Sequence, residues 1–242
     1  MKKLVIIIFL LFSIPALSQT TEEDGKNMIK LNLSAFVFKG FNLQYERQVS
    51  KKVTIAAGYG LIPVSSIPFK SYLQKEVYIP NVDVSSYHAG NSVFTPEVRF
   101  YVGKKGAFHG FYLAPYTRLG FYKINGPVRY SNSLGEDRNA HFSGKFTAIT
   151  GGLLIGSAWR ISGRFYFDWW IVGASFGGEK GNFTTIAALT PDDQASLKKN
   201  LNSISLEGVQ LTSAVNGNGA IIKTSGSMVG LRGLGINFGM RF

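Results

Sequence analysis

From residue 28 onward, hydrophobic residues alternate with polar or small ones, and turn residues bound each alternating segment. Residues 53–61 show the pattern most clearly. There Val53, Ile55, Ala57, Tyr59 and Leu61 alternate with Thr54, Ala56, Gly58 and Gly60. Successive side chains of a β-strand point to opposite faces of a sheet, so this period predicts strands with one apolar and one polar face.

The pattern predicts eight strands, whose connections alternate in length. The turns after the second, fourth and sixth strands are short, and so is the first hairpin. The connections after the third, fifth and seventh strands are long and cover residues 62–92, 124–142 and 176–226. The predicted strands cover residues 28–38, 41–49, 53–61, 93–102, 111–123, 143–159, 164–175 and 227–242.

This arrangement predicts the fold class: an all-β, eight-stranded antiparallel transmembrane β-barrel with long extracellular loops. Outer-membrane barrels have short periplasmic turns and longer extracellular loops, and about ten residues of a tilted strand cross a bilayer. The sheet must close, because unpaired backbone groups in lipid are costly. Pro96 and Pro115 fall inside predicted strands, where each removes a ladder hydrogen bond and is expected to mark an outward bulge.

The start of the chain has the organisation of a secretory signal peptide. Lys2 and Lys3 precede an apolar run to Leu17 that is too short for a membrane-spanning helix. Small residues before Gln19 predict cleavage at that point. The expected division is a signal peptide over residues 1–18, a short periplasmic tail over 19–27 and the barrel over 28–242, located in the cell outer membrane.

Composition narrows the classes of function further. The chain has a formal net charge of +12 and no cysteine, which excludes disulfides and thiolate metal sites. A basic protein suggests nucleic acid as a partner, but export and the lack of a recognisable nucleic-acid module argue against it. Aromatic residues make up 14% of the sequence, as expected of a barrel with aromatic girdles at both membrane interfaces.

The last strand ends in an aromatic residue preceded by apolar residues at every second position. This pattern resembles the C-terminal assembly signal of outer-membrane barrels, so the expected partners are outer-membrane lipid and lipopolysaccharide, the barrel-assembly machinery and a larger outer-membrane complex. The residues of the predicted signal are Leu234, Ile236, Phe238, Met240 and Phe242.

Charged residues at inward positions predict a structural charge network in the lumen. An eight-stranded barrel is just wide enough for side chains to fill, and buried charges need partners. The predicted members are Glu46, Glu97, Arg99, Arg118, Arg164 and Asp168.

No motif predicts catalysis, a cofactor or a metal site. His88 and His141 lie on the predicted outer side and His109 on the other, without the spacing of metal ligands or of a catalytic pair. Within the last long connection, Thr190 followed by Pro191 and two acids predicts the start of a helix. Residues 216–219 predict a turn rather than a phosphate-binding loop.

Three segments together resemble a Bacteroidota outer-membrane β-barrel family of unknown function, similar in plan to the eight-stranded barrel of the outer-membrane-protein-A type. These segments are Tyr45-Glu46-Arg47, Pro96 to Tyr101 and Gly110 to Tyr116. The resemblance covers about residues 28–123 and implies fold and location without an activity.

The expected function is that of a non-enzymatic outer-membrane barrel, structural or accessory, or binding a target through its extracellular loops. One alternative is a small pore or lipophile-transport barrel, against which the bulky inward side chains argue. A second alternative is an outer-membrane hydrolase, which needs a Ser or Asp beside a His at the outer rim.

Overall fold

The computed structural model describes residues 25–68, 86–131, 134–202 and 208–242. The predicted signal peptide lies outside the described residues, as does most of the predicted tail. The described part contains nine strands: β1 (Asn27–Asn32), β2 (Phe41–Gln48), β3 (Val53–Ser66), β4 (His88–Tyr101), β5 (Gly110–Ser131), β6 (Asp137–Ser162), β7 (Phe165–Ile186), β8 (Val209–Asn216) and β9 (Gly219–Arg241). Two helices accompany them, α2 (Ser34–Val37) and α4 (Pro191–Asn202).

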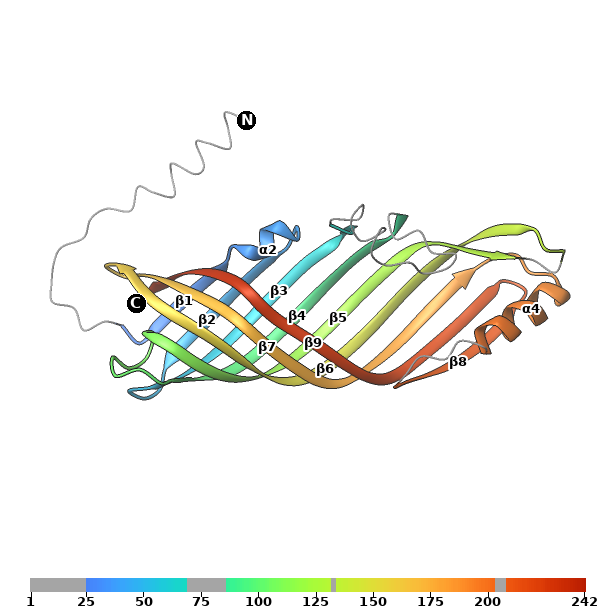
Figure 1. Cartoon of the computed structure of the whole chain (residues 1–242). Helices are drawn as coiled ribbons and strands as arrows, with labels where there is room; N and C mark the ends of the chain where they lie inside the picture. Colours follow the sequence, from blue (N-terminus) through green and yellow to red (C-terminus); the bar gives the residue numbers. More distant parts are fainter. Residues whose placement is uncertain (1–24, 69–85, 132–133, 203–207) are drawn as a thin grey trace, which may run out of the picture.

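All nine described strands belong to one antiparallel sheet that closes in a ring (Figure 1). The order is β1-β2-β3-β4-β5-β6-β7-β9, and β1 pairs with β9 to close it, for example at Leu31 opposite Phe238. β8 lies outside this ring of eight and pairs with β9 alone, along the part of that strand that β1 does not reach. The predicted all-β antiparallel fold is therefore confirmed, with a ninth strand that the sequence pattern did not predict.

The strands differ greatly in length, and this divides the sheet into two zones. β1 and β2 have 6 and 8 residues, whereas β5, β6, β7 and β9 have 22, 26, 22 and 23. The long strands continue past the ring in an extension that we call the blade (Figure 1). The blade consists of residues 120–131, 137–148, 177–186 and 219–228, together with β8 and α4.

The blade corrects the prediction of long loops. Most of the predicted loop over residues 124–142 is a continuous hairpin of β5 and β6, paired out to Ser131 opposite Asp137. Much of the predicted loop over residues 176–226 is strand as well, in β7, β8 and β9. Hydrophobic alternation weakens there because these segments are rich in Gly, Ser and Thr, so periodicity alone did not distinguish them from loops.

The first predicted strand is shorter than its apolar pattern suggested. β1 ends at Asn32, whose side-chain oxygen accepts a hydrogen bond from the Ala35 backbone N–H at 2.8 Å. The chain then forms the one-turn helix α2, and the Ser34 hydroxyl bonds to the backbone of Leu234 and Ile236 on β9. These side-chain bonds compete with the sheet ladder and end the strand.

Partway along β7 the inward-facing residues switch from even-numbered to odd-numbered positions, and β9 makes the matching switch beside it. We call this switch the parity change. Asp168 and Trp170 are buried before the change, and Gly173 and Ser175 are buried after it. Ile171 is the extra residue in the β6–β7 register, and Leu234, beside it on β9, has a φ of 54°. A bulge of this kind shifts all later side chains to the other face of a sheet.

Helix α4 begins as its sequence predicted. The Thr190 hydroxyl accepts a hydrogen bond from the Asp193 N–H, and the Asp193 carboxylate accepts one from the Thr190 N–H, both at 3.2 Å. This reciprocal pair satisfies two backbone donors that a helix start leaves free. Neither helix in the described ranges is long and apolar enough to span a membrane.

Candidate functional site

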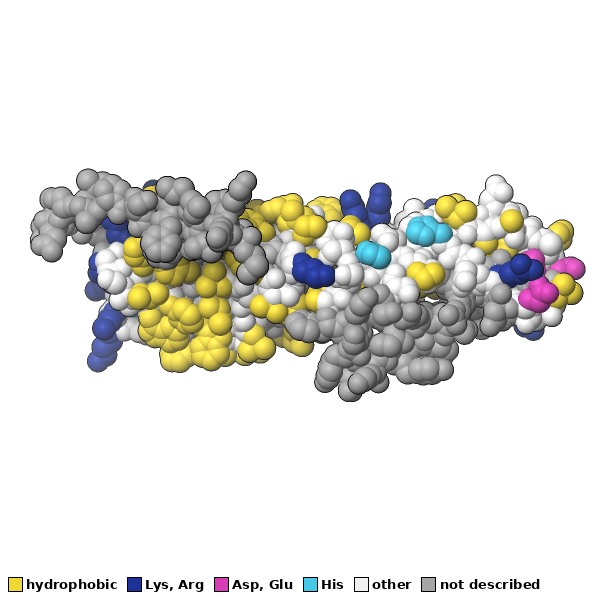
Figure 2. Space-filling view, turned by 90° about the horizontal axis from the view of Figure 1, so that it is seen from above, with side chains coloured by type: hydrophobic (Ala, Val, Ile, Leu, Met, Phe, Trp, Pro, Cys, Tyr) yellow, Lys and Arg dark blue, Asp and Glu magenta, His cyan; other side chains and the backbone are white. Residues whose placement is uncertain are grey.

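The outer wall of the ring is apolar. Figure 2 shows hydrophobic side chains gathered over the ring end of the molecule and fewer of them over the blade. Along β6 the exposed apolar positions run from Ile149 to Ile161. These twelve steps cover roughly 40 Å of strand at about 3.3 Å per residue, which at a tilt of about 45° is roughly 28 Å of height, close to a bilayer core.

Exposed aromatic residues are present at both ends of this wall, as in the girdles of outer-membrane barrels. Those towards the turns are Phe100, Phe111, Trp159, Phe165 and Phe238. Those towards the blade are Phe41, Tyr59, Phe94, Phe121 and Phe176.

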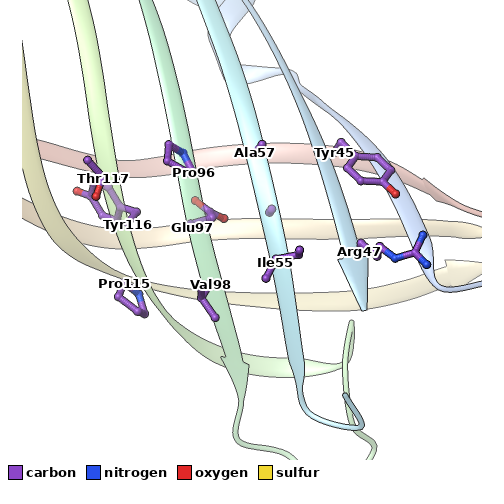
Figure 3. A pocket seen from close by; sticks show the side chains of 11 residues that line it. Tyr45, Arg47, Ile55, Ala57, Pro96, Glu97, Val98, Pro115, Tyr116 and Thr117 are labelled. Atoms are coloured by element: carbon purple, nitrogen blue, oxygen red, sulfur yellow. The ribbon is translucent and has the colours of Figure 1, made fainter. Parts of the chain in front are cut away.

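A shallow groove interrupts the wall where β4 and β5 each contain a proline. Figure 3 shows Pro96 between Ala57 and Thr117 and Pro115 beside Val98, with Arg47 towards one end of the groove, which has a volume of about 570 Å³. Ladder pairing between β4 and β5 is broken around both prolines, as expected because proline has no N–H to donate.

The lumen of the ring is filled by a layer of buried ion pairs, which we call the ion layer. Lys30 on β1 contacts Glu46 on β2 and Asp168 on β7, the latter at 2.6 Å. Arg99 on β4 lies between three acids, 2.7 Å from Asp168, 3.0 Å from Glu46 and 2.6 Å from Glu97. All five side chains are buried, so each charge depends on these partners rather than on water.

A sixth member completes the ion layer. Arg232 on β9 binds the second carboxylate oxygen of Glu97 at 2.5 Å. The layer then holds three cations and three acids, and its formal charge is zero. Its members are Lys30, Arg99, Arg232, Glu46, Glu97 and Asp168.

Neutral side chains satisfy further lone pairs of the three acids. Tyr112 donates to Asp168 at 2.7 Å, and Tyr101 donates to Glu46 at 2.9 Å. Thr54 also donates to Glu46, at 2.5 Å. Buried polar networks stabilise a fold only when their members are satisfied, and these contacts meet that condition for Glu46 and Asp168.

Towards the turns, the lumen is closed by the β4–β5 connection. Phe108 has no exposed surface, and the Arg241 guanidinium lies 4.7 Å from the centre of its ring. Tyr166 packs edge-on against Phe108 and accepts a hydrogen bond from Arg241. This aromatic and cationic packing seals the end of the ring opposite the blade.

On the blade side of the ion layer, the lumen contains donors without acceptors. The Tyr116 hydroxyl, the Trp170 indole N–H and the Arg118 Nε–H are buried and have no hydrogen-bond partner among the described residues. The Arg232 guanidinium lies 4.0 Å from the centre of the Trp170 ring and 5.1 Å from that of Tyr116. This part of the lumen, between the ion layer and the blade, is what we call the upper lumen. It is therefore rich in positive charge and in N–H and O–H groups.

The structure brings together four of the six residues predicted for the lumen network: Glu46, Glu97, Arg99 and Asp168. Arg118 shares the lumen but is half-buried, with no ion pair among the described residues. Arg164 was predicted wrongly, because it lies exposed at the β6–β7 turn, outside the sheet that encloses the lumen.

Sequence reasoning missed two cations, Lys30 and Arg232. In the first strand, alternation puts Lys30 on the face that points away from the side of Leu31 and Leu33. Its inward position therefore follows from the sequence. Arg232 becomes inward only through the parity change beside Leu234, which no alternation pattern reveals.

Four residues of the predicted assembly signal lie on the outward face of β9, and Phe242 follows the last residue of that strand; all five are exposed. Their role in assembly stays a prediction. Leu234 differs from the other four because its positive φ places it at the bulge rather than in the regular ladder.

The histidines are not grouped. His88 pairs with Asn125 on β5, and His141 lies on β6 opposite Pro127, so one whole strand separates the two. His109 packs against Tyr166 near the turns. Among the described residues no group of three His, Cys, Asp or Glu side chains could hold a metal ion.

The fold and the site define a class of protein: a closed antiparallel β-ring with an apolar outer wall and a lumen filled by charged side chains. The chain belongs to the family described as "Protein of unknown function (DUF3575)", which it matches over residues 5–180. No curated protein matches it.

Two solved structures resemble the chain distantly. CarO of Acinetobacter baumannii is 12% identical, over 90% of this chain and 98% of that one, with a TM-score of 0.41. A major outer membrane protein from Thermus thermophilus is 11% identical, over 89% of this chain and 99% of that one, with a TM-score of 0.38. Likeness at this level lends no weight to a location or an activity for this chain.

Proposed function

We propose that this chain is a non-enzymatic outer-membrane barrel whose sealed lumen makes it a rigid support for the blade. One observation supports the proposal most strongly: apolar side chains cover the outside of the ring while six charged side chains are buried inside it. This is the reverse of the arrangement in a soluble protein. Such an outer wall is stable in lipid, and a closed ring leaves no unpaired strand edge there.

The two ends of the ring differ in a way that supports an orientation. The β2–β3, β4–β5 and β6–β7 turns gather at one end with the C-terminus, and the blade extends from the other (Figure 1). Short turns face the periplasm in barrels of this kind, so we assign the blade to the outside of the cell.

A band of lysines where the blade begins supports contact with lipopolysaccharide. Lys123, Lys145, Lys180 and Lys223 are exposed on the outward faces of four neighbouring strands, just beyond the apolar wall. Lys123 lies directly opposite Lys145 in the sheet, and like charges in such a pair are destabilising. Phosphate groups of the outer leaflet would relieve this repulsion. The barrel-assembly machinery, which we expect to read the last strand, is the second proposed partner.

The blade is the part best placed for binding outside the cell or for joining a larger outer-membrane complex. The proposed role is therefore structural, accessory or surface-binding. A pore is disfavoured because the ion layer and Phe108 fill the ring. A hydrolase is disfavoured because neither exposed histidine on the blade side has a Ser or Asp hydrogen bond among the described residues.

The orientation can be tested by labelling single cysteines, since the chain has none of its own. Asn218 is exposed in the β8–β9 turn of the blade, and Lys105 is exposed in the β4–β5 turn. In intact cells a membrane-impermeant maleimide should label Asn218→Cys, and Lys105→Cys only after the outer membrane is permeabilised. Equal labelling of both in intact cells contradicts the orientation. Stable conductance steps in planar bilayers would overturn the sealed lumen and favour the pore.

A further inference from the structure

Three donors in the upper lumen point to a ligand. The Tyr116 hydroxyl, the Trp170 Nε1–H and the Arg118 Nε–H have no acceptor in the part of the chain that the structure describes, and Tyr116 and Trp170 are 4% and 6% exposed. Buried N–H and O–H groups in native proteins nearly always have a partner. Three donors without a hydrogen-bond partner therefore indicate that the upper lumen needs acceptor atoms from another molecule.

Two of the three groups lie against the same guanidinium. Tyr116 on β5 and Trp170 on β7 lie against Arg232 from two sides, and the positive charge of Arg232 acts on Arg118, which is two residues after Tyr116. The Trp170 ring is held over Gly235, where a Cβ would approach the ring to 2.6 Å. The Trp170 donor is thus held in position before any ligand arrives.

The acids of the ion layer are already paired with the cations of that layer. The ion layer is neutral by itself, with Lys30, Arg99 and Arg232 balanced by its three acids. Arg118, on the blade side of the layer, has no ion pair among the described residues, so the acids of the layer do not balance its positive charge. A buried charge without a partner is unfavourable, and a single negative charge would correct it.

We propose that this part of the lumen, which we call the anion site, binds an oxyanion group, a carboxylate or a phosphate. Its oxygens accept hydrogen bonds from Arg118, Tyr116 and Trp170, while Arg232 lies beneath with Glu97 on its far side. The ligand enters from the blade, because Phe108 and Arg241 close the other end. The Tyr116 and Trp170 rings flank the group and limit its contact with water.

The test uses the full mature protein folded in detergent, with inorganic phosphate and acetate as probes. Each replaces chloride at constant ionic strength, and melting temperature and tryptophan emission are followed together. The wild type should gain about 3 °C or more at ten times the dissociation constant, with a change in emission that Trp170→Phe abolishes. No shift with either anion overturns the proposal, and water then fills the site.

The matched variants are Arg118→Gln, which removes a positive charge from the lumen, and Lys198→Gln, which removes one from the exposed surface of α4. Arg118→Gln should weaken binding about tenfold or more, the loss expected for a charged hydrogen bond, and should not lower the melting temperature without anion, because it removes an unpaired charge. Lys198→Gln should bind as the wild type does. Equal weakening by both variants, or an anion-independent loss of stability in Arg118→Gln, overturns the anion site while leaving the proposed membrane location intact.

Discussion

Asp168 is the acid on which the ion layer depends most directly, so its replacement tests the reasoning about buried charge. It accepts bonds from Lys30 at 2.6 Å, from Arg99 at 2.7 Å and from Tyr112 at 2.7 Å. Asp168→Asn keeps the shape of the side chain but leaves two acids against three cations. Removing one partner of a buried ion pair costs roughly 3–5 kcal/mol, and we expect Asp168→Asn to lose that much unfolding free energy.

A double-mutant cycle of Asp168 with Lys30 distinguishes the cost of an unpaired buried charge from the cost of lost packing. Lys30→Met alone leaves an excess of one negative charge and should also cost roughly 3–5 kcal/mol. The double variant Asp168→Asn, Lys30→Met restores neutrality, with two acids and two cations. It should therefore be destabilised by much less than the sum of the single variants, with a coupling energy of about 2 kcal/mol or more.

The assay is urea unfolding of the protein in phospholipid vesicles, followed by tryptophan fluorescence. Lys198→Ala on the exposed face of α4 is the control and should change stability by no more than about 0.5 kcal/mol. Two results would refute the reasoning: single variants that lose less than about 1 kcal/mol, or a double variant whose loss equals the sum of the two.

Three further predictions concern the outer wall and the ends of the chain. Ile236 and Ile221 lie on β9 with nearly equal exposure, 42% and 43%, but only Ile236 is in the wall. Ile236→Arg should cost about 2–4 kcal/mol of folding free energy in vesicles and Ile221→Arg little; equal losses would contradict a lipid-facing wall. Deleting Phe242 should reduce heat-modifiable, folded protein in isolated outer membranes, and normal accumulation would argue against an assembly signal. Mass analysis of the mature protein should find its N-terminus at Gln19, and recovery of intact Met1 would exclude cleavage.

The period-two pattern predicted the ring because each of its strands has one lipid-like and one packed face. The alternation within each strand was enough to predict that four charged residues face the lumen, and the structure places them in one layer although they lie on three different strands. They are Glu46, Glu97, Arg99 and Asp168. Parity is a local property, so it transfers reliably from sequence to structure as long as no bulge intervenes.

What the sequence did not reveal depends on bulges and on polar strands. Arg232 reaches Glu97 because the inward-facing positions of β9 switch beside Leu234. The positive φ of Leu234 cannot be predicted from the alternation of apolar and polar residues. The blade was missed because a strand with two solvated or glycine-rich faces lacks the contrast that periodicity detects. Residues 177–182, Gly-Gly-Glu-Lys-Gly-Asn, are typical of a loop by composition and form part of β7.

The ring is closed by the two strands that stand farthest apart in the chain, and this fixes an order of events. Asn32 and Asn237, which meet across the β1–β9 seam, are 205 positions apart, and contacts of such separation form late because of the entropy lost in closing a long loop. Before closure, β2 to β9 hold three acids of the ion layer but only two of its cations. Lys30 arrives with β1, so the step that seals the wall also neutralises the ion layer. A chain that stalls before that step is left with both an open edge and an unbalanced charge, and neither defect can be repaired without the other.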